Sequence, residues 1–172
     1  MHVVILVGAS GSGKTTIAKA VAERFPEAIE VLFFDSIGVP SADTMITEYG
    51  SVEGWQRAKT FEWMQRLVSL SGSGRNIILE GQMRLAFLSE GASAAGLSSY
   101  TPILIDCDDA TRARRLIVDR QQPELATDDM MNWAAYLRSE ALDVGCDVLD
   151  TSELSLEQAI SYVAERSLSA LP

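Results

Sequence analysis

The feature that most constrains this chain is a glycine-rich loop between an apolar segment and an amphipathic one. Residues 8–15 read Gly-Ala-Ser-Gly-Ser-Gly-Lys-Thr and match the phosphate-loop pattern G-x-x-x-x-G-K-[ST] at every fixed position. The apolar run Val3–Val7 precedes the loop. Apolar residues at three- and four-residue spacing follow it as far as Phe25, before Pro26 ends the helix. A strand, a tight turn and a helix in this order predict an anion site at the helix N-terminus.

Each part of the loop has a role in binding phosphate. A Cβ atom at Gly8 or Gly13 would obstruct the backbone N–H groups that turn inward around an anion. Lys14 supplies a point charge for the β- and γ-phosphates, and Thr15 offers its hydroxyl to Mg²⁺. We therefore expect ATP and Mg²⁺ as cofactors. The expected ATP-binding residues of the loop are Gly8, Ala9, Ser10, Gly11, Ser12, Gly13, Lys14, Thr15 and Thr16.

Further apolar runs predict the rest of a sheet. They cover residues 31–34, 77–79, 103–105 and 148–149 and are continuously apolar, which is typical of strands buried on both faces of a parallel sheet. Helical stretches separate the runs, so we expect a three-layer, doubly wound α/β fold with a five-stranded parallel sheet. The length of 172 residues suits a single domain over residues 1–172.

Capping residues and helix breakers mark the helices. The connection at 41–71 is long and largely helical, and it ends in a Ser-Gly-Ser-Gly turn at 71–74. A later helix is expected to run towards Gln121, and Gly145 ends the helix after it. The expected N-caps are Ser51, Asp108 or Asp109, Thr127 and, in a capping box with Gln158, Ser155. The buried side of the last helix is expected to hold Ala159, Ile160, Val163 and Leu168.

The charge balance narrows the class of partner. The chain has 14 Lys and Arg against 24 Asp and Glu, a net charge of −10, which opposes binding to nucleic acid or to an anionic membrane. No apolar run suits a signal sequence or a membrane span, so we expect a cytoplasmic protein. Cys107 and Cys146 form no metal-binding spacing and are expected to be buried, reduced thiols.

Weaker features accompany the loop in the order found in one group of enzymes. They are acids at the ends of strands, an arginine-rich stretch at 112–120 and the ending Val-Leu-Asp-Thr-Ser at 148–152. With them the chain resembles the P-loop small-molecule kinases, which include nucleoside monophosphate kinases, shikimate kinase and gluconate kinase. The resemblance implies a P-loop NTPase core, a helical acceptor-binding segment at about 41–71 and a lid at about 109–130. It also implies an ATP-dependent phosphotransferase that moves the γ-phosphoryl group to a small metabolite or nucleotide.

Acids at the carboxyl ends of predicted strands stand where ligands bind in open α/β sheets. By resemblance, Asp35 orients the acceptor hydroxyl or acts as the general base, so it joins Lys14 in the expected catalytic group. Glu80 is expected to share the metal with Thr15, although the roles of Asp35 and Glu80 are interchangeable on the sequence alone. Asp106 ends another strand and is expected to cap the following helix.

Arginines gather after this acid. Arg112 and Arg115 share a face of the expected helix, and Arg114 points away from it. By resemblance, Arg112 binds the phosphates of ATP, and Arg115 and Arg120 are catalytic lid arginines that stabilise the developing charge. Alternatively, these arginines lie on a solvated face and form ion pairs with Asp108, Asp109 and Asp119.

Two other arginines are candidates for holding the acceptor beside Asp35. Arg84 closely follows Glu80, and Arg57 lies in the long helical segment. The alternative for Arg57 is a solvated position on the helix surface. The aromatic residues near it, Trp55, Phe61 and Trp63, are expected to pack the segment.

Two other functions compete with the kinase. One is a regulatory ATPase or nucleotide switch that acts through a protein partner. The guanine-reading pattern N-K-x-D is absent from the sequence, which disfavours a GTPase switch. The other is a polynucleotide end-kinase, which the net charge of −10 disfavours. We expect a monomer or homodimer with a small-molecule acceptor, without nucleic-acid or membrane partners.

Overall fold

A parallel sheet forms the centre of the molecule. The computed structural model describes residues 1–70, 72 and 74–169. Within them the sheet has five strands in the order β2-β3-β1-β4-β5, and every neighbouring pair is parallel. The strands are β1 (Val3–Val7), β2 (Ile29–Phe33), β3 (Asn76–Gly81), β4 (Thr101–Asp106) and β5 (Asp147–Asp150). The expected doubly wound α/β fold is confirmed.

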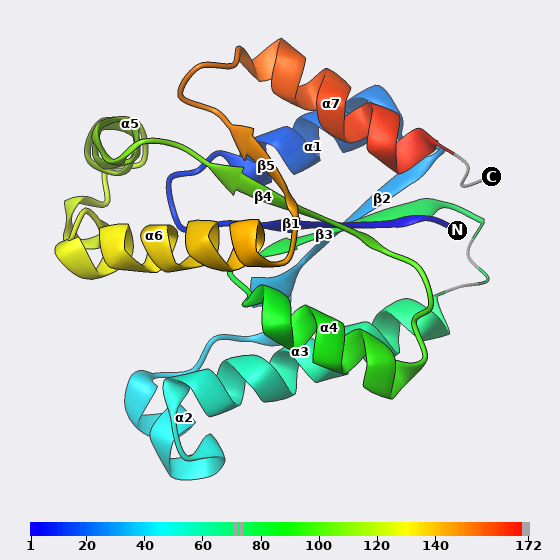
Figure 1. The fold of residues 1–172 in the computed structure, drawn as a ribbon, viewed down its shortest axis with the longest axis horizontal. Helices are drawn as coiled ribbons and strands as arrows, with labels where there is room; N and C mark the ends of the chain where they lie inside the picture. Colours follow the sequence, from blue (N-terminus) through cyan, green and yellow to red (C-terminus); the bar gives the residue numbers. More distant parts are fainter. Residues whose placement is uncertain (71, 73, 170–172) are drawn as a thin grey trace.

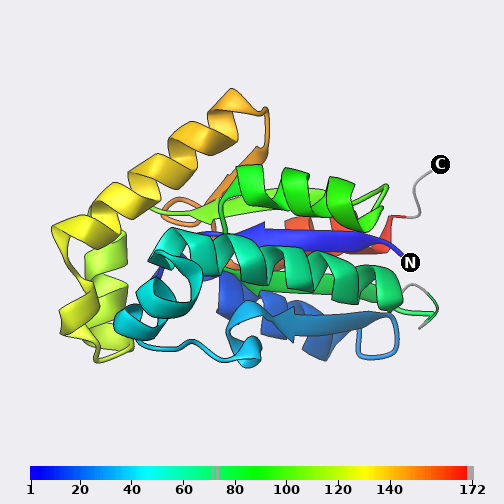
Figure 2. The same ribbon diagram turned by 90° about the horizontal axis from the view of Figure 1, so that it is seen from below.

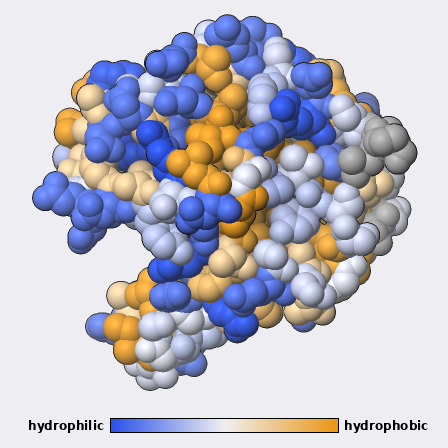
Figure 3. All heavy atoms as spheres, viewed as in Figure 1, coloured by the Kyte–Doolittle hydropathy of each residue, from blue (hydrophilic) through white to orange (hydrophobic). Residues whose placement is uncertain are grey.

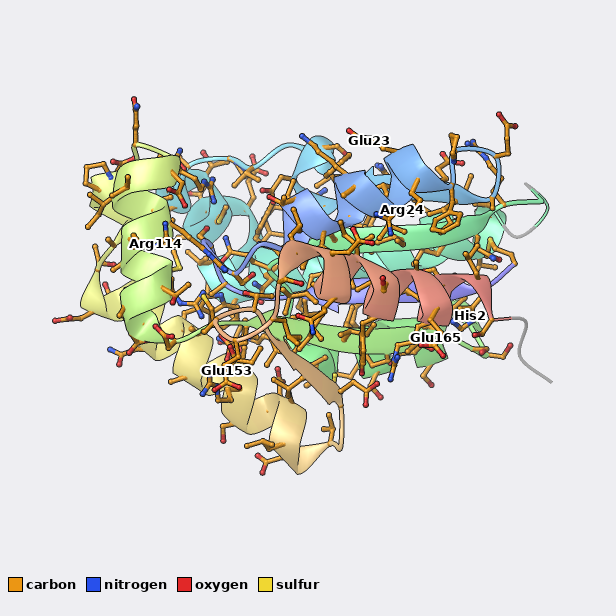
Figure 4. The ribbon with its side chains drawn as sticks, turned by 90° about the horizontal axis from the view of Figure 1, so that it is seen from above. His2, Glu23, Arg24, Arg114, Glu153 and Glu165 are labelled. Carbon is orange, nitrogen blue, oxygen red and sulfur yellow. The ribbon has the colours of Figure 1, made fainter. Side chains whose placement is uncertain are left out.

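Helices cover both faces of the sheet (Figures 1 and 2). They are α1 (Lys14–Arg24), α2 (Ala42–Tyr49), α3 (Val52–Ser69), α4 (Leu85–Ala95), α5 (Asp109–Arg114), α6 (Asp128–Asp143) and α7 (Leu156–Leu168). Helices α1 and α7 lie side by side on one face (Figure 4). Arg24 of α1 and Glu157 of α7 form an ion pair of 2.7 Å between them. Helices α3, α4 and α6 lie on the other face. None of the described helices has the length and apolar composition needed to cross a membrane.

The residues of β1 explain why the strands read as continuously apolar. Val3, Ile5 and Val7 belong to the core under α3 and α4, whereas Val4 and Leu6 belong to the core under α1 and α7. Successive side chains of a strand point to opposite faces, so a strand covered on both sides needs apolar residues at every position.

The expected N-caps of the helices are confirmed. Ser51, Asp108, Thr127 and Ser155 each accept a hydrogen bond from the backbone N–H group three residues later, and Ser155 forms the predicted capping box. The connection at 41–71 divides into α2 and α3 at Gly50, whose φ of 79° suits the end of a helix. The turn expected at 71–74 includes residues 71 and 73, which lie outside the described residues.

Several local expectations differ from the structure. Strand β2 begins before residue 31, and Phe34 starts a 3₁₀ turn, η1 (Phe34–Ile37). The helix expected to run towards Gln121 changes after α5 into a π-helical turn, η2 (Arg115–Asp119), which a 3₁₀ turn, η3 (Pro123–Leu125), follows. Leu168 is exposed, because the neighbouring Ser167 faces the core at the end of α7. Cys107 is buried and Cys146 is half-buried, both as free thiols.

Candidate active site

The loop at 8–15 forms a cradle of backbone between β1 and α1. At Gly11 and Gly13 the φ angles are 80° and 95°, which glycine adopts without strain. A Cβ atom at Gly8 would lie 2.3 Å from the carbonyl oxygen of Ile105. Within the described part of the chain, no side chain caps the N-terminus of α1 at Gly13. The N–H groups of the first helical turn therefore remain available to an anion.

Lys14 begins α1 with only 8% of its surface exposed. Among the described residues, its ammonium group forms no hydrogen bond or salt bridge. Burial lowers the pKa of Lys14, and the charges of Glu80 and Asp35 partly oppose this shift. The hydroxyl of Ser12 is also buried without a partner in the described part of the chain. A buried cation and a buried hydroxyl that lack protein partners fit the phosphate chain of a nucleotide.

Thr15 and Glu80, the two expected metal ligands, are in contact. The Thr15 hydroxyl donates to Oε2 of Glu80 at 3.1 Å. Burial raises the pKa of Glu80, and both the charge of Lys14 and the hydrogen bond from Thr15 oppose the shift. Among the described residues no group of three or more His, Cys, Asp or Glu could hold a metal ion on its own. A hydroxyl and a carboxylate fit Mg²⁺, which keeps several waters and takes phosphate oxygens as further ligands.

A cavity of about 530 Å³, the nucleotide cavity, joins the loop to the start of α7. Its lining includes Lys14, Thr15 and Thr16 from the loop and first turn of α1, and Leu154, Leu156 and Ala159 from the other side. Phosphate-binding groups thus share one cavity with an apolar wall. Its volume and mixed lining suit a nucleotide, whose polyphosphate is charged and whose base has flat apolar faces.

Arg120 faces the nucleotide cavity with its charge free for a ligand. It lines the cavity and lowers the pKa of Lys14 by its charge. It forms no hydrogen bond or salt bridge through its side chain within the described chain. The backbone N–H of Arg120 closes the π-helical turn on the carbonyl of Arg115 at 2.9 Å, and Gln121 follows with a φ of 54°. Arg120 therefore stands at the end of a π-helical turn, a feature that is frequent at functional sites.

Arg115 lines the same cavity, but its guanidinium group donates its hydrogen bonds to other parts of the protein. Its guanidinium donates to the carbonyl oxygens of Gly11 and Ser12 at 3.3 Å and to both oxygens of Thr151 at 2.8 Å. Arg115 therefore ties the loop to the segment after β5. Arg114 points outward, as expected, and pairs with Asp119 at 3.3 Å.

Arg112 does not reach the nucleotide cavity, contrary to the expectation that it binds phosphate. Its side chain is 0% exposed. It donates to Asp106 at 2.6 Å and to the carbonyl oxygen of Ser10 at 3.0 Å. Arg138 of α6 binds the other oxygen of Asp106 at 2.6 Å. Asp106 therefore does not cap α5, which Asp108 does, because two arginines occupy its carboxylate. Arg112 instead supports the loop backbone.

A second cavity, of about 480 Å³, lies where η1, the start of α3 and α6 approach one another. Figure 3 shows a hollow on this side, between the parts that Figure 1 labels α6 and α2. Asp35 and Arg84, two of the candidates for holding the acceptor, line the cavity. Arg57 does not, because it pairs with Glu90 at 2.9 Å and lies over the Phe61 ring on the surface. The lining consists of Phe34, Asp35, Val39, Val52, Glu53, Trp55, Gln56, Gln82, Arg84 and Trp133.

Gln82 connects the second cavity to the loop. Its side-chain nitrogen donates to the Ser10 hydroxyl at 3.2 Å, and its side-chain oxygen accepts from the indole of Trp133 at 3.1 Å. Gln56 donates to the backbone carbonyl of Gln82 at 2.8 Å. Gln82, Trp133, Arg138 and Thr151 were not among the expected site residues. The available signal for Gln82 was its place just beyond the end of a strand.

Comparison with known proteins places the chain among related structures. A family model described as an AAA domain matches residues 4–141. A sugar kinase from Janibacter sp. HTCC2649 has 21% identity and a TM-score of 0.67, with 95% of this chain and 92% of that chain covered. Shikimate kinase from Acinetobacter baumannii in complex with shikimate has 15% identity and a TM-score of 0.63, with 96% and 92% covered.

A third similar structure is the APS kinase of Mycobacterium tuberculosis in complex with AMPPNP and APS. It has 16% identity and a TM-score of 0.60, with 98% of each chain covered. No curated protein matches the chain. At these identities the solved structures show a shared fold. That fold is the one the resemblance to P-loop small-molecule kinases implied.

Proposed function

The chain belongs to the AAA domain family, and from this membership and the two cavities we propose that it is an ATP- and Mg²⁺-dependent phosphotransferase with a small-molecule acceptor. The observation that carries the proposal is the approach of both cavities to the phosphate loop. Lys14 and Thr15 line the nucleotide cavity, Asp35 lines the second cavity, and the charge of Asp35 acts on Lys14. An ATPase that only hydrolyses its nucleotide needs no second cavity beside the phosphates.

Each charged or polar group beside the phosphate loop has a role in the proposed reaction. The acceptor hydroxyl oxygen forms a bond to the γ-phosphorus, the bond from that phosphorus to the leaving oxygen of ADP breaks, and the hydroxyl proton passes to Asp35. Lys14 and Arg120 hold the charge that develops on the phosphoryl oxygens. Thr15 and Glu80 would hold Mg²⁺, which neutralises phosphate charge. The contact between Thr15 and Glu80 supports this division of roles between the two acids.

The similar structures support the assignment of the cavities by analogy. One was solved with shikimate and another with AMPPNP and APS. We propose that this chain holds ATP in the nucleotide cavity under a lid at 109–130. Its acceptor would lie in the second cavity, beside the segment at 41–71. The net charge of −10 supports an acceptor other than nucleic acid. We also propose that the protein acts in the cytoplasm.

The test is ADP release from MgATP with and without added acceptors. The panel contains nucleosides, nucleoside monophosphates, sugars, sugar acids and cyclic alcohols. Lys14→Ala is expected to abolish acceptor-dependent ADP release, whereas Lys19→Ala, on the exposed side of α1, is expected to retain it. ADP release that no acceptor changes would favour the regulatory ATPase. Unchanged turnover in Lys14→Ala would show that the loop is not the ATP site.

A further inference from the structure

The ionised side chains of the second cavity oppose an anionic ligand. Asp35 and Glu53 are acids, and Arg84 is the cation among the described residues that line it. Its ionised side chains therefore sum to a single negative charge. An acceptor that carried a carboxylate, sulfate or phosphate would place a further negative charge beside two carboxylates, at a cost that specific sites avoid.

Arg84 is held by contacts of its guanidinium group with the protein, whereas its buried Nε has no hydrogen-bond partner among the described residues. Its guanidinium pairs with Glu53 at 3.4 Å. The same group lies over the rings of Tyr136, Trp133 and Phe87, at 4.7, 5.4 and 5.7 Å. These contacts tie α3, α4 and α6 together around the cavity. The guanidinium group therefore forms part of the cavity wall, and the carboxylate of Glu53 offsets its charge before any acceptor enters.

The neighbouring cations on α3 are also paired away from the cavity. Arg57 binds Glu90 at 2.9 Å, and Lys59 binds Glu62 at 2.9 Å. None of these cations lines the cavity within the described structure. An anionic acceptor would need one or more of them to turn inward and leave a carboxylate unpaired.

The remaining residues of the lining favour a ligand with an apolar ring or chain. Phe34 and Trp55 meet edge to face at 5.9 Å, and Trp133 supplies a further ring from α6. Val39 and Val52 contribute apolar surface that is otherwise exposed. A volume of about 480 Å³ leaves room for a ring or chain in addition to the hydroxyl.

Resting on the proposed function, we propose that the acceptor is an alcohol without negative charge, uncharged or amine-bearing, that carries an apolar ring or chain. The hydroxyl lies at Asp35, and the rings of Trp55 and Trp133 contact the apolar part. An ammonium group, where the acceptor has one, lies near Glu53.

The experiment compares ligands that share one skeleton and differ in charge. Phenylalaninol, phenylpropanediol and phenyllactate form one series, and adenosine and AMP form a second, which is measured with the nucleotide cavity saturated by a non-hydrolysable ATP analogue. Binding is followed by quenching of tryptophan fluorescence, because Trp55 and Trp133 line the cavity, and turnover by ADP release from MgATP. We expect the uncharged and cationic members to bind at least about tenfold more tightly than the anionic member of each series.

Glu53→Gln provides the internal test. It releases Arg84 from its ion pair, so the anionic members should gain at least about tenfold in affinity while the uncharged members change little. Glu90→Gln is the matched control, because it breaks the Arg57 pair outside the cavity and should leave the charge preference unchanged. A preference that Glu53→Gln does not alter would overturn the proposal.

The outcomes separate this inference from the proposed function. Tighter binding of phenyllactate or AMP to the unaltered protein, or binding of no member at all, would overturn the inference. ADP release that depends on an anionic acceptor would also overturn the inference, but it would support the proposed phosphotransferase activity. The expected charge preference in binding, with ADP release that no acceptor changes, would uphold the inference about the cavity and contradict the phosphotransferase.

Discussion

The side-chain amide of Gln82 donates to the hydroxyl of Ser10 at 3.2 Å, across 72 positions of sequence. It thereby joins the wall of the second cavity to the phosphate loop, and Trp133 holds the other end of the amide. Gln82→Leu removes both hydrogen bonds. We expect kcat/KM for the acceptor to fall about tenfold, equivalent to about 1.4 kcal/mol, with a smaller change in KM for ATP.

Steady-state kinetics with the identified acceptor checks this effect. Gln65→Leu is the control, because Gln65 is exposed on α3 away from both cavities. Equal losses in the two variants would show that Gln82 does not connect the second cavity to the loop.

Lys14→Ala removes a buried ammonium group that the described structure leaves without a hydrogen-bonding partner. We expect nucleotide affinity to fall at least about 100-fold, because a charge-assisted contact to phosphate is lost. The melting temperature should not fall, because burial already disfavours the charged form, as the lowered pKa of Lys14 indicates. Binding of a fluorescent ATP analogue and thermal unfolding measure the two effects. An unchanged affinity would contradict the role given to Lys14.

Gly8→Ala tests the close approach of the loop to β4. The new Cβ would lie 2.3 Å from the carbonyl oxygen of Ile105 and 2.8 Å from the Ser12 hydroxyl. We expect a loss of about 1–3 kcal/mol in the free energy of unfolding, which urea titration measures. Gly72→Ala is the control, because a Cβ there meets no atom of the described residues within 4 Å. Equal stability of the two variants would rule out steric contact as the reason for glycine at position 8.

Local chemistry made much of the fold predictable. The caps at Ser51, Asp108 and Thr127 each depend on one side chain and an N–H group three residues away, so a short window of sequence contains both partners. The loop is likewise a local pattern. The contact between Thr15 and Glu80 follows less directly, because it requires β3 to lie beside β1, which the sheet order provides.

The arginines could not be sorted by such patterns. Arg112 and Arg115 share a helix face as expected, yet Arg112 is buried on Asp106 whereas Arg115 binds Thr151. Arg57 and Arg84 were both candidates for holding the acceptor, with a solvated surface position as the alternative for Arg57, and of the two only Arg84 lines the cavity in the structure. Apart from Asp106, which lies six residues before Arg112, the partners come from distant segments, such as Ser10 for Arg112 and Thr151 for Arg115, and the spacing of residues does not encode them.

Asp106→Asn tests the buried network behind the loop. Arg112, 0% exposed, would lose the charge that balances it, and Arg138 would lose its partner. We expect the free energy of unfolding to fall by about 3–5 kcal/mol, as for other buried pairs that lose one member. Asp119→Asn, which breaks the exposed pair with Arg114, should cost at most about 1 kcal/mol. Urea unfolding measures both losses. Similar losses would show that the buried ion pairs of Asp106 contribute no more to stability than the exposed pair of Asp119.

Glu80 should make the free energy of unfolding fall as pH rises above about 4.5. Burial raises its pKa above the ordinary value of 4.5, so between these two values the folded protein holds a proton that the unfolded chain releases. The contribution of Glu80 to the free energy of unfolding is therefore complete below about pH 4.5 and is lost as pH rises through the raised pKa. Glu80→Gln has no proton to lose, so its stability relative to the unaltered protein should increase steadily across that window. Urea titrations from pH 4 to 8 measure the difference. Glu23→Gln is the control, because Glu23 is exposed on the surface of α1. Parallel profiles for the unaltered protein and Glu80→Gln would contradict a raised pKa at this carboxylate.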